Sequence, residues 1–259
     1  MPDGLVDEDG VPVNLDPLTV EKWFQTIEGD FNIDIQSLID LAVDEPIPAR
    51  LRQSLSRSIA IQYLRTRAVR NMIVDMAVQL ARKITNDAIT LNFGDEALEY
   101  GPKIDYSDQA AGLIQIGQIL DENRIDELAG ILNGHVWQIL NNPTGQPFYT
   151  SDNPVALHNH FDRPKFRPGR GLASPGIEIA FPLSSQKLLS ICDRGTFNGA
   201  AIDRGAADVK SENVKFYNSL QVLDSERQIY CEGSDWFLVE DMIKESPRLT
   251  EKQSRVSVD

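Results

Sequence analysis

The clearest pattern of hydrophobic positions follows Pro48 and extends to Ile89, with no proline or glycine in between. Its members recur every three or four residues, as expected for the buried face of one α-helix. In chain order the stripe contains Leu51, Leu55, Ile59, Gln62, Thr66, Val69, Ile73, Ala77, Leu80 and Ile84. The spacing predicts a single buried helix over about residues 48–89, roughly 55–60 Å long at about 1.5 Å per residue.

Two polar residues, Gln62 and Thr66, lie one turn apart within this apolar stripe, and Arg65 lies on a neighbouring face. A buried amide or hydroxyl costs free energy unless it finds a hydrogen-bond partner. Two interpretations stay open at this point. Thr66 bonds back to the carbonyl of Gln62 while the amide braces a loop, or the polar pair belongs to a ligand site.

Shorter patterns predict the remaining elements. Helices are expected from Asp16 to Gly29, near residues 35–42, and over residues 107–120 and 123–132. From His135 onward, short β-friendly segments alternate with Pro, Gly, Asn and Asp, which is typical of short strands. These segments are VWQIL, PFYT, PVALH, GIEIAFPL and LLSICD, followed by a helix over residues 206–219, a strand over 227–231 and a helix over 236–243.

Helices first and strands later predict an α+β fold rather than a doubly wound parallel sheet. We expect one globular domain over residues 17–245, with a helical part (17–134) and a strand-rich part (135–245). Residues 1–16 read as an acidic, poorly ordered segment and residues 246–259 as a polar tail.

The charged residues are distributed unevenly along the chain, and this distribution is more informative than the net charge. The 39 acidic residues outnumber the 25 basic ones, for a net charge of −14, so tight binding to generic nucleic acid is not expected. Residues 46–84, however, hold eight bases against one acid, a local charge of +7. These bases either form a basic groove or are neutralised by the acidic flanks, and the second interpretation is the more usual outcome.

Two cysteines, Cys192 and Cys231, are too few for a disulfide scaffold and fit a reducing compartment. The N-terminal sequence has neither the basic nor the apolar region of a signal peptide. No apolar run approaches the roughly 18 residues of a membrane span. We therefore expect a cytoplasmic protein without a membrane partner, while the sequence gives no indication of its oligomeric state.

Several motifs resemble a bacterial family known only as domain of unknown function 4238. The family's most specific motif is an aromatic residue followed by Ser-Asp-Asn-Pro-Val, with a later strand that ends in Phe-Pro-Leu-Ser. Here they read Phe148-Tyr149-Thr150-Ser151-Asp152-Asn153-Pro154-Val155 and Phe181-Pro182-Leu183-Ser184, while Gln62-Tyr63-Leu64-Arg65-Thr66 resembles the family's Gln-x-x-Arg-Thr pattern. The segment Val214–Tyr230 resembles its C-terminal helix and strand, and the likeness covers about residues 17–243.

One feature of the family is missing. Its members typically begin with a His-x-Val-Pro segment, and nothing similar occurs in residues 1–16. Either this is a shortened member, or the segment is supplied elsewhere. A shortened member would lack any chemistry that depends on that histidine. The resemblance itself implies no particular reaction.

The Ser-Asp-Asn-Pro motif has two physical interpretations. Asp152 or Asn153 can accept backbone N–H groups in a turn, and Pro154 fixes its own φ angle. The same turn also presents a carboxylate at the end of a strand, where catalytic groups are common. The motif is therefore structural, catalytic or both.

Two further segments contain candidate ligands. His158, His160 and Asp162 would share one face of an extended segment, and imidazole and carboxylate suit a divalent metal. Because three residues on one strand do not close a metal site, we predict no cofactor and keep a divalent metal as the less favoured alternative. In the loop after these residues, Arg163, Lys165, Arg167 and Arg170 surround Phe166, which suits an anion, although a solvated surface loop is the more common case.

These residues support an enzyme hypothesis, with hydrolase-like chemistry on an anionic or phosphate-bearing substrate. Its cleft would lie between the long helix and the Ser-Asp-Asn-Pro turn, with Asp152 or the backbone of its turn within hydrogen-bond reach of Arg65 or Gln62. The catalytic candidates are Asp152, Asn153 and Arg65, and the substrate-binding candidates are Gln62, Thr66, Ser151, Arg163, Lys165, Arg167 and Arg170.

The alternative is a non-catalytic binding or interaction module in which the same polar residues form an internal brace. An open pocket would favour the enzyme, and closed, mutually bonded side chains would favour the brace. The sequence contains no Gly-x-Ser-x-Gly elbow, no phosphate-binding Gly-x-x-x-x-Gly-Lys loop and no dinucleotide fingerprint that would name a reaction.

Overall fold

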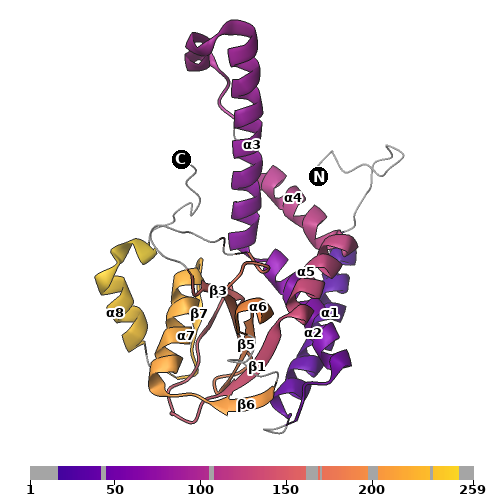
Figure 1. The fold of residues 1–259 in the computed structure, drawn as a ribbon, viewed down its shortest axis with the longest axis vertical. Helices are drawn as coiled ribbons and strands as arrows, with labels where there is room; N and C mark the ends of the chain where they lie inside the picture. The colour runs from indigo at the N-terminus through magenta and orange to yellow at the C-terminus, as the bar shows by residue number, and fades with distance from the viewer. Residues whose placement is uncertain are drawn as a thin grey trace.

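The computed structural model describes residues 17–41, 45–104, 108–161, 169, 171–197, 204–233 and 236–250. Helices come first and the strands follow, which confirms the predicted α+β class (Figure 1). The N-terminal helical part consists of α1 (Pro17–Ile39), α2 (Ala49–Leu64), α3 (Arg67–Phe93), the 3-10 helix η1 (Asp95–Tyr100), α4 (Asp108–Leu120) and α5 (Glu122–Gly134). The acidic segment 1–16 lies outside the described residues, so its predicted disorder stays a prediction.

A five-stranded mixed sheet forms the centre of the molecule, in the strand order β3-β4-β5-β1-β6. Its strands are β1 (Val136–Asn141), β3 (Ala156–Asn159), β4 (Ile177–Pro182), β5 (Lys187–Cys192) and β6 (Arg204–Asp208). All neighbours are antiparallel except β1 and β6, which are parallel. A separate antiparallel ribbon pairs β2 (Thr150–Ser151) with β7 (Ile229–Tyr230).

The described C-terminal half also contains the helices α6 (Arg194–Phe197), α7 (Ser211–Asp224) and α8 (Phe237–Glu245) and the 3-10 helix η2 (Pro247–Thr250). Among the helices that the structure describes, none combines the length and the apolar character needed to cross a membrane.

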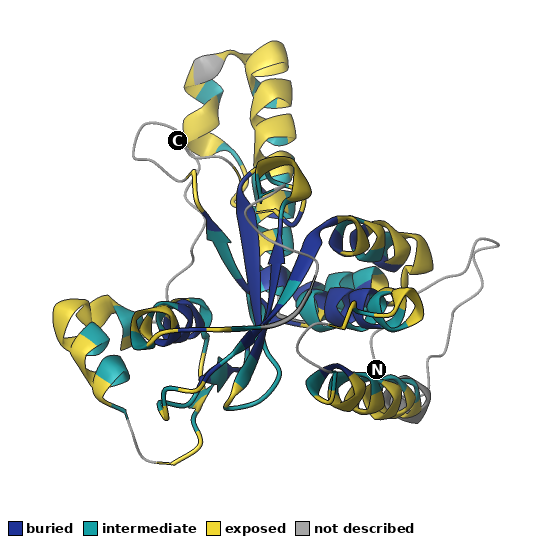
Figure 2. Cartoon of the chain, turned by 60° about the horizontal axis from the view of Figure 1, so that its bottom comes forward, coloured by how far each residue is buried: buried dark blue, intermediate teal, exposed yellow. Residues whose placement is uncertain are grey.

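Strand alternation gives the sheet two apolar faces. Along β4, Ile177, Ile179 and Phe181 belong to a core shared with α1, α2 and α5, whereas Ala180 packs with Val214 and Leu220 of α7. This arrangement follows from the period of two in a strand, because successive side chains point to opposite faces. Figure 2 shows the buried residues concentrated in the sheet and in the helix faces turned toward it.

The first helix is longer than predicted. Gly29 does not end it, and α1 continues from Pro17 to Ile39. Glycine in a helix interior costs about 1 kcal/mol relative to alanine. Here the apolar stripe continues across the glycine with helical spacing, from Phe24 and Ile27 to Phe31 and Ile35, and packs on the main core. The packing of this face therefore outweighs the local preference.

The predicted single helix over residues 48–89 is wrong in one respect, because the chain breaks it between α2 and α3. Thr66 is extended, with φ −68° and ψ 148°, and its side chain accepts the Val69 N–H as the N-cap of α3. Threonine caps helices because its hydroxyl replaces a missing backbone partner. The capping residue was thus present in the sequence, but the uninterrupted apolar periodicity concealed it.

Burial of the stripe also ends halfway along. Leu55 and Ile59 are fully buried, whereas Leu80 and Ile84 are each 60% exposed. The distal part of α3 projects from the body of the molecule, with η1 folded back along one side of it (Figure 1). The predicted burial therefore holds for α2 and the base of α3 but not for the projecting part.

The predicted helix over residues 206–219 begins too early. Residues 204–208 form β6, which pairs in parallel with β1, and α7 begins only at Ser211. Alanine-rich segments favour helices locally. Here the free edge of β1 offers backbone partners, for example through Val209 N–H to the carbonyl of Asn141 at 2.9 Å. The long-range pairing overrides the local propensity.

Candidate functional site

A polar pocket of about 560 Å³ lies where the α2–α3 junction faces the turn after β2. We call it the arginine pocket. It is lined by Gln62, Arg65, Thr66, Arg67, Arg70, Gln115, Ser151, Asp152, Arg227, Gln228 and Tyr230. The two motifs singled out in the sequence, about 85 residues apart along the chain, therefore meet in one pocket as predicted.

The α2–α3 junction forms one wall and is held by hydrogen bonds to its backbone. The Thr66 hydroxyl donates to the carbonyl of Tyr63 at 2.8 Å, and Gln115 Nε2 donates to the carbonyls of Leu64 and Thr66 at 3.1 Å each. The interpretation of Thr66 as locally satisfied is thus confirmed, although its acceptor is Tyr63 rather than Gln62. These bonds keep the helix break open at the position where the pocket forms.

Arginines dominate the lining. Arg65 Nη1 donates to Glu28 Oε1 of α1 at 2.6 Å. Arg67, Arg70 and Arg227 also line the pocket, and Asp152 is the one carboxylate among its described lining residues. The Nε atom of Arg67 is buried and has no hydrogen-bond partner within the described part of the chain. The pocket therefore carries more positive charge than its own residues neutralise.

The basic segment 46–84 accordingly follows both interpretations. Arg57 pairs with Glu122 and, at 2.5 Å, with Asp126 of α5, and Arg65 pairs with α1. These contacts are the expected internal neutralisation. Arg67 and Arg70 instead line the pocket and supply the basic groove.

The Ser-Asp-Asn-Pro turn divides into a structural and an open part. Ser151 Oγ donates to Gln221 Oε1 of α7 at 2.9 Å, and Asn153 Nδ2 donates to the carbonyl of Asp224 at 3.1 Å. Gln221 Nε2 returns a bond to the carbonyl of Pro154 at 3.0 Å. Ser151 and Asn153 are both buried, so they brace the turn against α7, and Asn153 is not among the lining residues.

Asp152 lies between these two residues and lines the pocket. Its Oδ1 accepts the backbone N–H of Glu226 at 3.0 Å, and its own N–H donates to the carbonyl of Gln228 at 3.1 Å. The predicted bond from Arg65 or Gln62 to Asp152 is not formed among the described contacts. Arg65 and Asp152 line the same pocket while each bonds to another group, so the space between them is open.

Six lining residues were not among the sequence candidates, namely Arg67, Arg70, Gln115, Arg227, Gln228 and Tyr230. The positive charge of the 46–84 segment pointed to Arg67 and Arg70 only as members of a basic group, without marking either residue. The likeness of Val214–Tyr230 to the family pointed to the last three without assigning them to a site. Only the approach of β7 to β2 shows that they face the same pocket.

The histidine candidates lie elsewhere, at the β3 edge of the main sheet. His160 Nε2 is 2.7 Å from Oε2 of the buried Glu178, while Ser190 and Tyr217 donate to Oε1 at 2.6 and 2.8 Å. The ring of His158 contacts that of His160 edge-on, with the centroids 4.6 Å apart. Within the described residues no group of three His, Cys, Asp or Glu side chains is arranged to hold a metal, and Asp162 lies outside them.

The pKa values in this cluster follow from its bonds. Burial alone would raise the pKa of Glu178, but the hydrogen bonds from His160, Ser190 and Tyr217 outweigh it and lower the pKa below its ordinary value. Burial, together with the nearby Glu178 charge, raises the pKa of Cys192 to about 12. Glu178 is therefore a fully bonded, ionised group of the core, and Cys192 is a protonated thiol.

The basic loop predicted to bind an anion, with Arg163, Lys165, Arg167 and Arg170, lies outside the described residues. Its role stays a prediction.

Comparison with known proteins agrees with the motifs. A family model described as "Protein of unknown function (DUF4238)" matches residues 12–235. No curated protein and no solved structure matches the chain.

Proposed function

Because this chain belongs to the DUF4238 family, whose function is unknown, we propose from its geometry that the arginine pocket binds an anionic, phosphate-bearing molecule. In this proposal Arg67, Arg70 and Arg227 hold the anion, and Asp152 acts on the bound molecule as an acid or base in hydrolase-like chemistry.

The observation that carries the proposal is the excess of guanidinium groups around an open cavity. Arg67, Arg70 and Arg227 line the cavity with Asp152 as the one carboxylate among its described lining residues, and Arg67 has a buried Nε without a partner in the described structure. Guanidinium groups form paired, charge-assisted hydrogen bonds with phosphate oxygens. A phosphate group in the cavity would accept N–H groups from the guanidinium ends of these arginines and neutralise their charge at once.

The role of Asp152 is supported by how it is held. Its Oδ1 accepts the Glu226 N–H, so the carboxylate is oriented by the backbone of the β7 side. A positioned carboxylate beside a bound phosphate ester is suited to proton transfer. The brace interpretation applies to the neighbouring Ser151 and Asn153, whose side chains bond to α7.

Calorimetric titration with inorganic pyrophosphate tests the binding step. We expect the wild-type protein to bind, and Arg67→Gln and Arg70→Gln each to weaken binding by about tenfold or more, as expected for loss of a charge-assisted bond. Arg57→Gln is the matched control, because Arg57 pairs with α5 and does not line the pocket. Wild-type protein that fails to bind pyrophosphate would refute the proposed function.

Turnover of aryl phosphate mono- and diesters tests the role of Asp152. Asp152→Asn keeps the shape of the side chain and the acceptor for Glu226, so pyrophosphate should still bind while turnover falls by about 10²-fold or more. Binding by the wild type without any turnover would instead favour the alternative, a non-catalytic binding module.

A further inference from the structure

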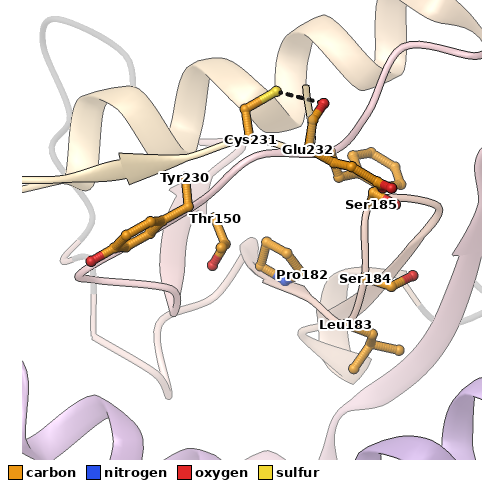
Figure 3. A pocket seen from close by; sticks show the side chains of 9 residues that line it. Thr150, Pro182, Leu183, Ser184, Ser185, Tyr230, Cys231 and Glu232 are labelled. Atoms are coloured by element: carbon orange, nitrogen blue, oxygen red, sulfur yellow. Dashed lines mark hydrogen bonds between the residues drawn. The ribbon is translucent and has the colours of Figure 1, made fainter. Parts of the chain in front are cut away.

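A second pocket, of about 350 Å³, adjoins the arginine pocket at Tyr230. We call it the ribbon pocket. It is lined by Phe148, Thr150, Pro182, Leu183, Ser184, Ser185, Tyr230, Cys231 and Glu232. In Figure 3 the segment from Tyr230 to Glu232 lies along one side, and Pro182, Leu183 and Ser184 lie across from it.

The strand register places both pockets on one face of the β2–β7 ribbon. Thr150 pairs with Tyr230, and the bond from Asp152 N–H to the Gln228 carbonyl continues this pairing. Directly opposed residues of an antiparallel pair share a face, so Thr150 and Tyr230 lie on one side of the ribbon, and Asp152 and Gln228 follow them into the arginine pocket. The Ser151 hydroxyl bonds to Gln221 of α7, although the residue also borders the arginine pocket.

Tyr230 lies where the two pockets meet. Its ring is half exposed, and its hydroxyl donates to Gln228 Oε1 at 2.6 Å. This bond restrains the ring, because a side chain fixed at its tip loses rotational freedom. A half-exposed, restrained aromatic ring is suited to stacking against a planar group.

The two ends of this face differ in chemistry. The arginine pocket offers Arg67, Arg70 and Arg227, whereas the described lining of the ribbon pocket contains apolar groups, two serines and Glu232 but no basic residue. A matching ligand is therefore anionic at one end. At its other end the ligand is planar and carries N–H groups, which can donate hydrogen bonds to serine and carboxylate oxygens.

We infer that the two pockets form one groove for a phosphate-bearing aromatic molecule of the nucleotide class. The phosphates lie among the arginines, the base stacks on Tyr230, and the far edge of the base faces the ribbon pocket. This inference rests on the proposed function, because it uses the same arginines for the phosphate end.

The experiment compares ligands of similar charge that carry different organic groups on the diphosphate. Titrations would use inorganic pyrophosphate, isopentenyl diphosphate (an apolar body without a ring) and the four common nucleoside diphosphates. We expect at least one nucleoside diphosphate to bind about tenfold or more tightly than pyrophosphate, with isopentenyl diphosphate closer to pyrophosphate. A base–aromatic stack of ordinary strength gives a gain of this size.

Tyr230→Leu then isolates the stacking step. It should weaken nucleotide binding at least fivefold and pyrophosphate binding by a clearly smaller factor, because Tyr230 also borders the arginine pocket. The matched control is Tyr100→Leu, which alters an 86% exposed tyrosine of η1 far from the ribbon in the chain and outside both pocket linings. Unchanged thermal unfolding of both variants would show that folding is intact.

The outcomes separate this inference from the proposed function. If pyrophosphate binds and no nucleoside diphosphate binds more tightly, or isopentenyl diphosphate binds equally well, the nucleotide inference is overturned and the anion pocket stands. An unchanged nucleotide affinity in Tyr230→Leu overturns it as well. If pyrophosphate does not bind, the proposed function falls together with this inference, which rests on it.

Discussion

At the scale of single residues, neighbouring side chains of one turn have opposite surroundings. The Ser151 and Asn153 side chains are buried and bond to α7, while Asp152 between them accepts the Glu226 N–H and lines the arginine pocket, which Ser151 also borders. The different hydrogen-bond partners of the three side chains fix this division. The Ser-Asp-Asn-Pro turn can therefore anchor itself through Ser151 and Asn153 and at the same time hold the Asp152 carboxylate at the pocket.

Glu178 shows how a buried charge is kept in the same protein. It is 6% exposed and accepts bonds from His160, Ser190 and Tyr217. A charge in the interior is tolerated only when such bonds replace its hydration. Because the described hydrogen bonds of Glu178 all come from other side chains of the protein, we infer that Glu178 stabilises the fold and does not bind a ligand.

A first prediction concerns these bonds. Tyr217→Phe should lower the free energy of unfolding by about 1–3 kcal/mol at neutral pH, because the buried Glu178 Oε1 loses one of its two donors. Denaturant unfolding measures this change. Tyr100→Phe, which alters an exposed hydroxyl, serves as the control and should leave the unfolding midpoint unchanged.

The pH dependence at Glu178 has a definite sign. Its pKa is lower in the folded protein than its ordinary value of 4.5, so the unfolded chain binds the proton more readily. The stabilisation is therefore complete at pH values above 4.5 and is lost as the pH falls through the lower folded pKa. Glu178→Gln should remove this part of the acid sensitivity, and a variant whose stability falls as steeply below that pH as the wild type would contradict the prediction.

At the scale of elements, the decisive event is the break between α2 and α3. Thr66 caps α3, and Gln115 of α4 bonds to the carbonyls on both sides of the break. Without the break, one continuous helix would pass the sheet without the backbone turn that forms a wall of the arginine pocket. The function proposed here thus depends on an interruption that the apolar spacing alone did not predict.

A second prediction compares two leucines of the same stripe. Leu55→Ala should cost about 2–5 kcal/mol, because it removes a fully buried side chain and leaves a cavity. Leu80→Ala should cost less than about 1 kcal/mol, because Leu80 is 60% exposed on the projecting part of α3. Denaturant midpoints of the two variants provide the measurement, and equal losses would show that the distal part of α3 is buried in solution.

At the scale of the whole molecule, charge is separated between the general surface and one pocket. The net charge of −14 repels polyanions at long range, whereas the arginine pocket concentrates guanidinium groups within about 560 Å³. Such an arrangement favours a small anion that enters the pocket over an extended polyanion that must approach the surface.

A third prediction follows from this separation. Generic double-stranded DNA or RNA should show no sub-micromolar binding at physiological salt in a gel-shift assay, because few phosphates could be neutralised. Sequence-independent binding at that concentration would show that the basic residues, including the loop 163–170, form a continuous surface. Competition by pyrophosphate would then tell whether the arginine pocket takes part.

The sequence by itself determined the α+β class, the order of helices and strands and the two motifs that meet at the pocket. Local periodicity is sufficient for these features, because it records which face of each element is apolar. The stripe over residues 48–89 identified the buried face of α2 and of the base of α3 in this way.

Tertiary structure alone decided whether each apolar face found a partner and which distant residues converged. The face of Leu80 and Ile84 has helical spacing yet remains exposed, and the alanines before α7 form a strand because the edge of β1 was free to pair. Arg227 and Tyr230 reach the pocket only through the β2–β7 ribbon. Such contacts depend on the free energy of long-range packing and pairing, which local spacing does not contain.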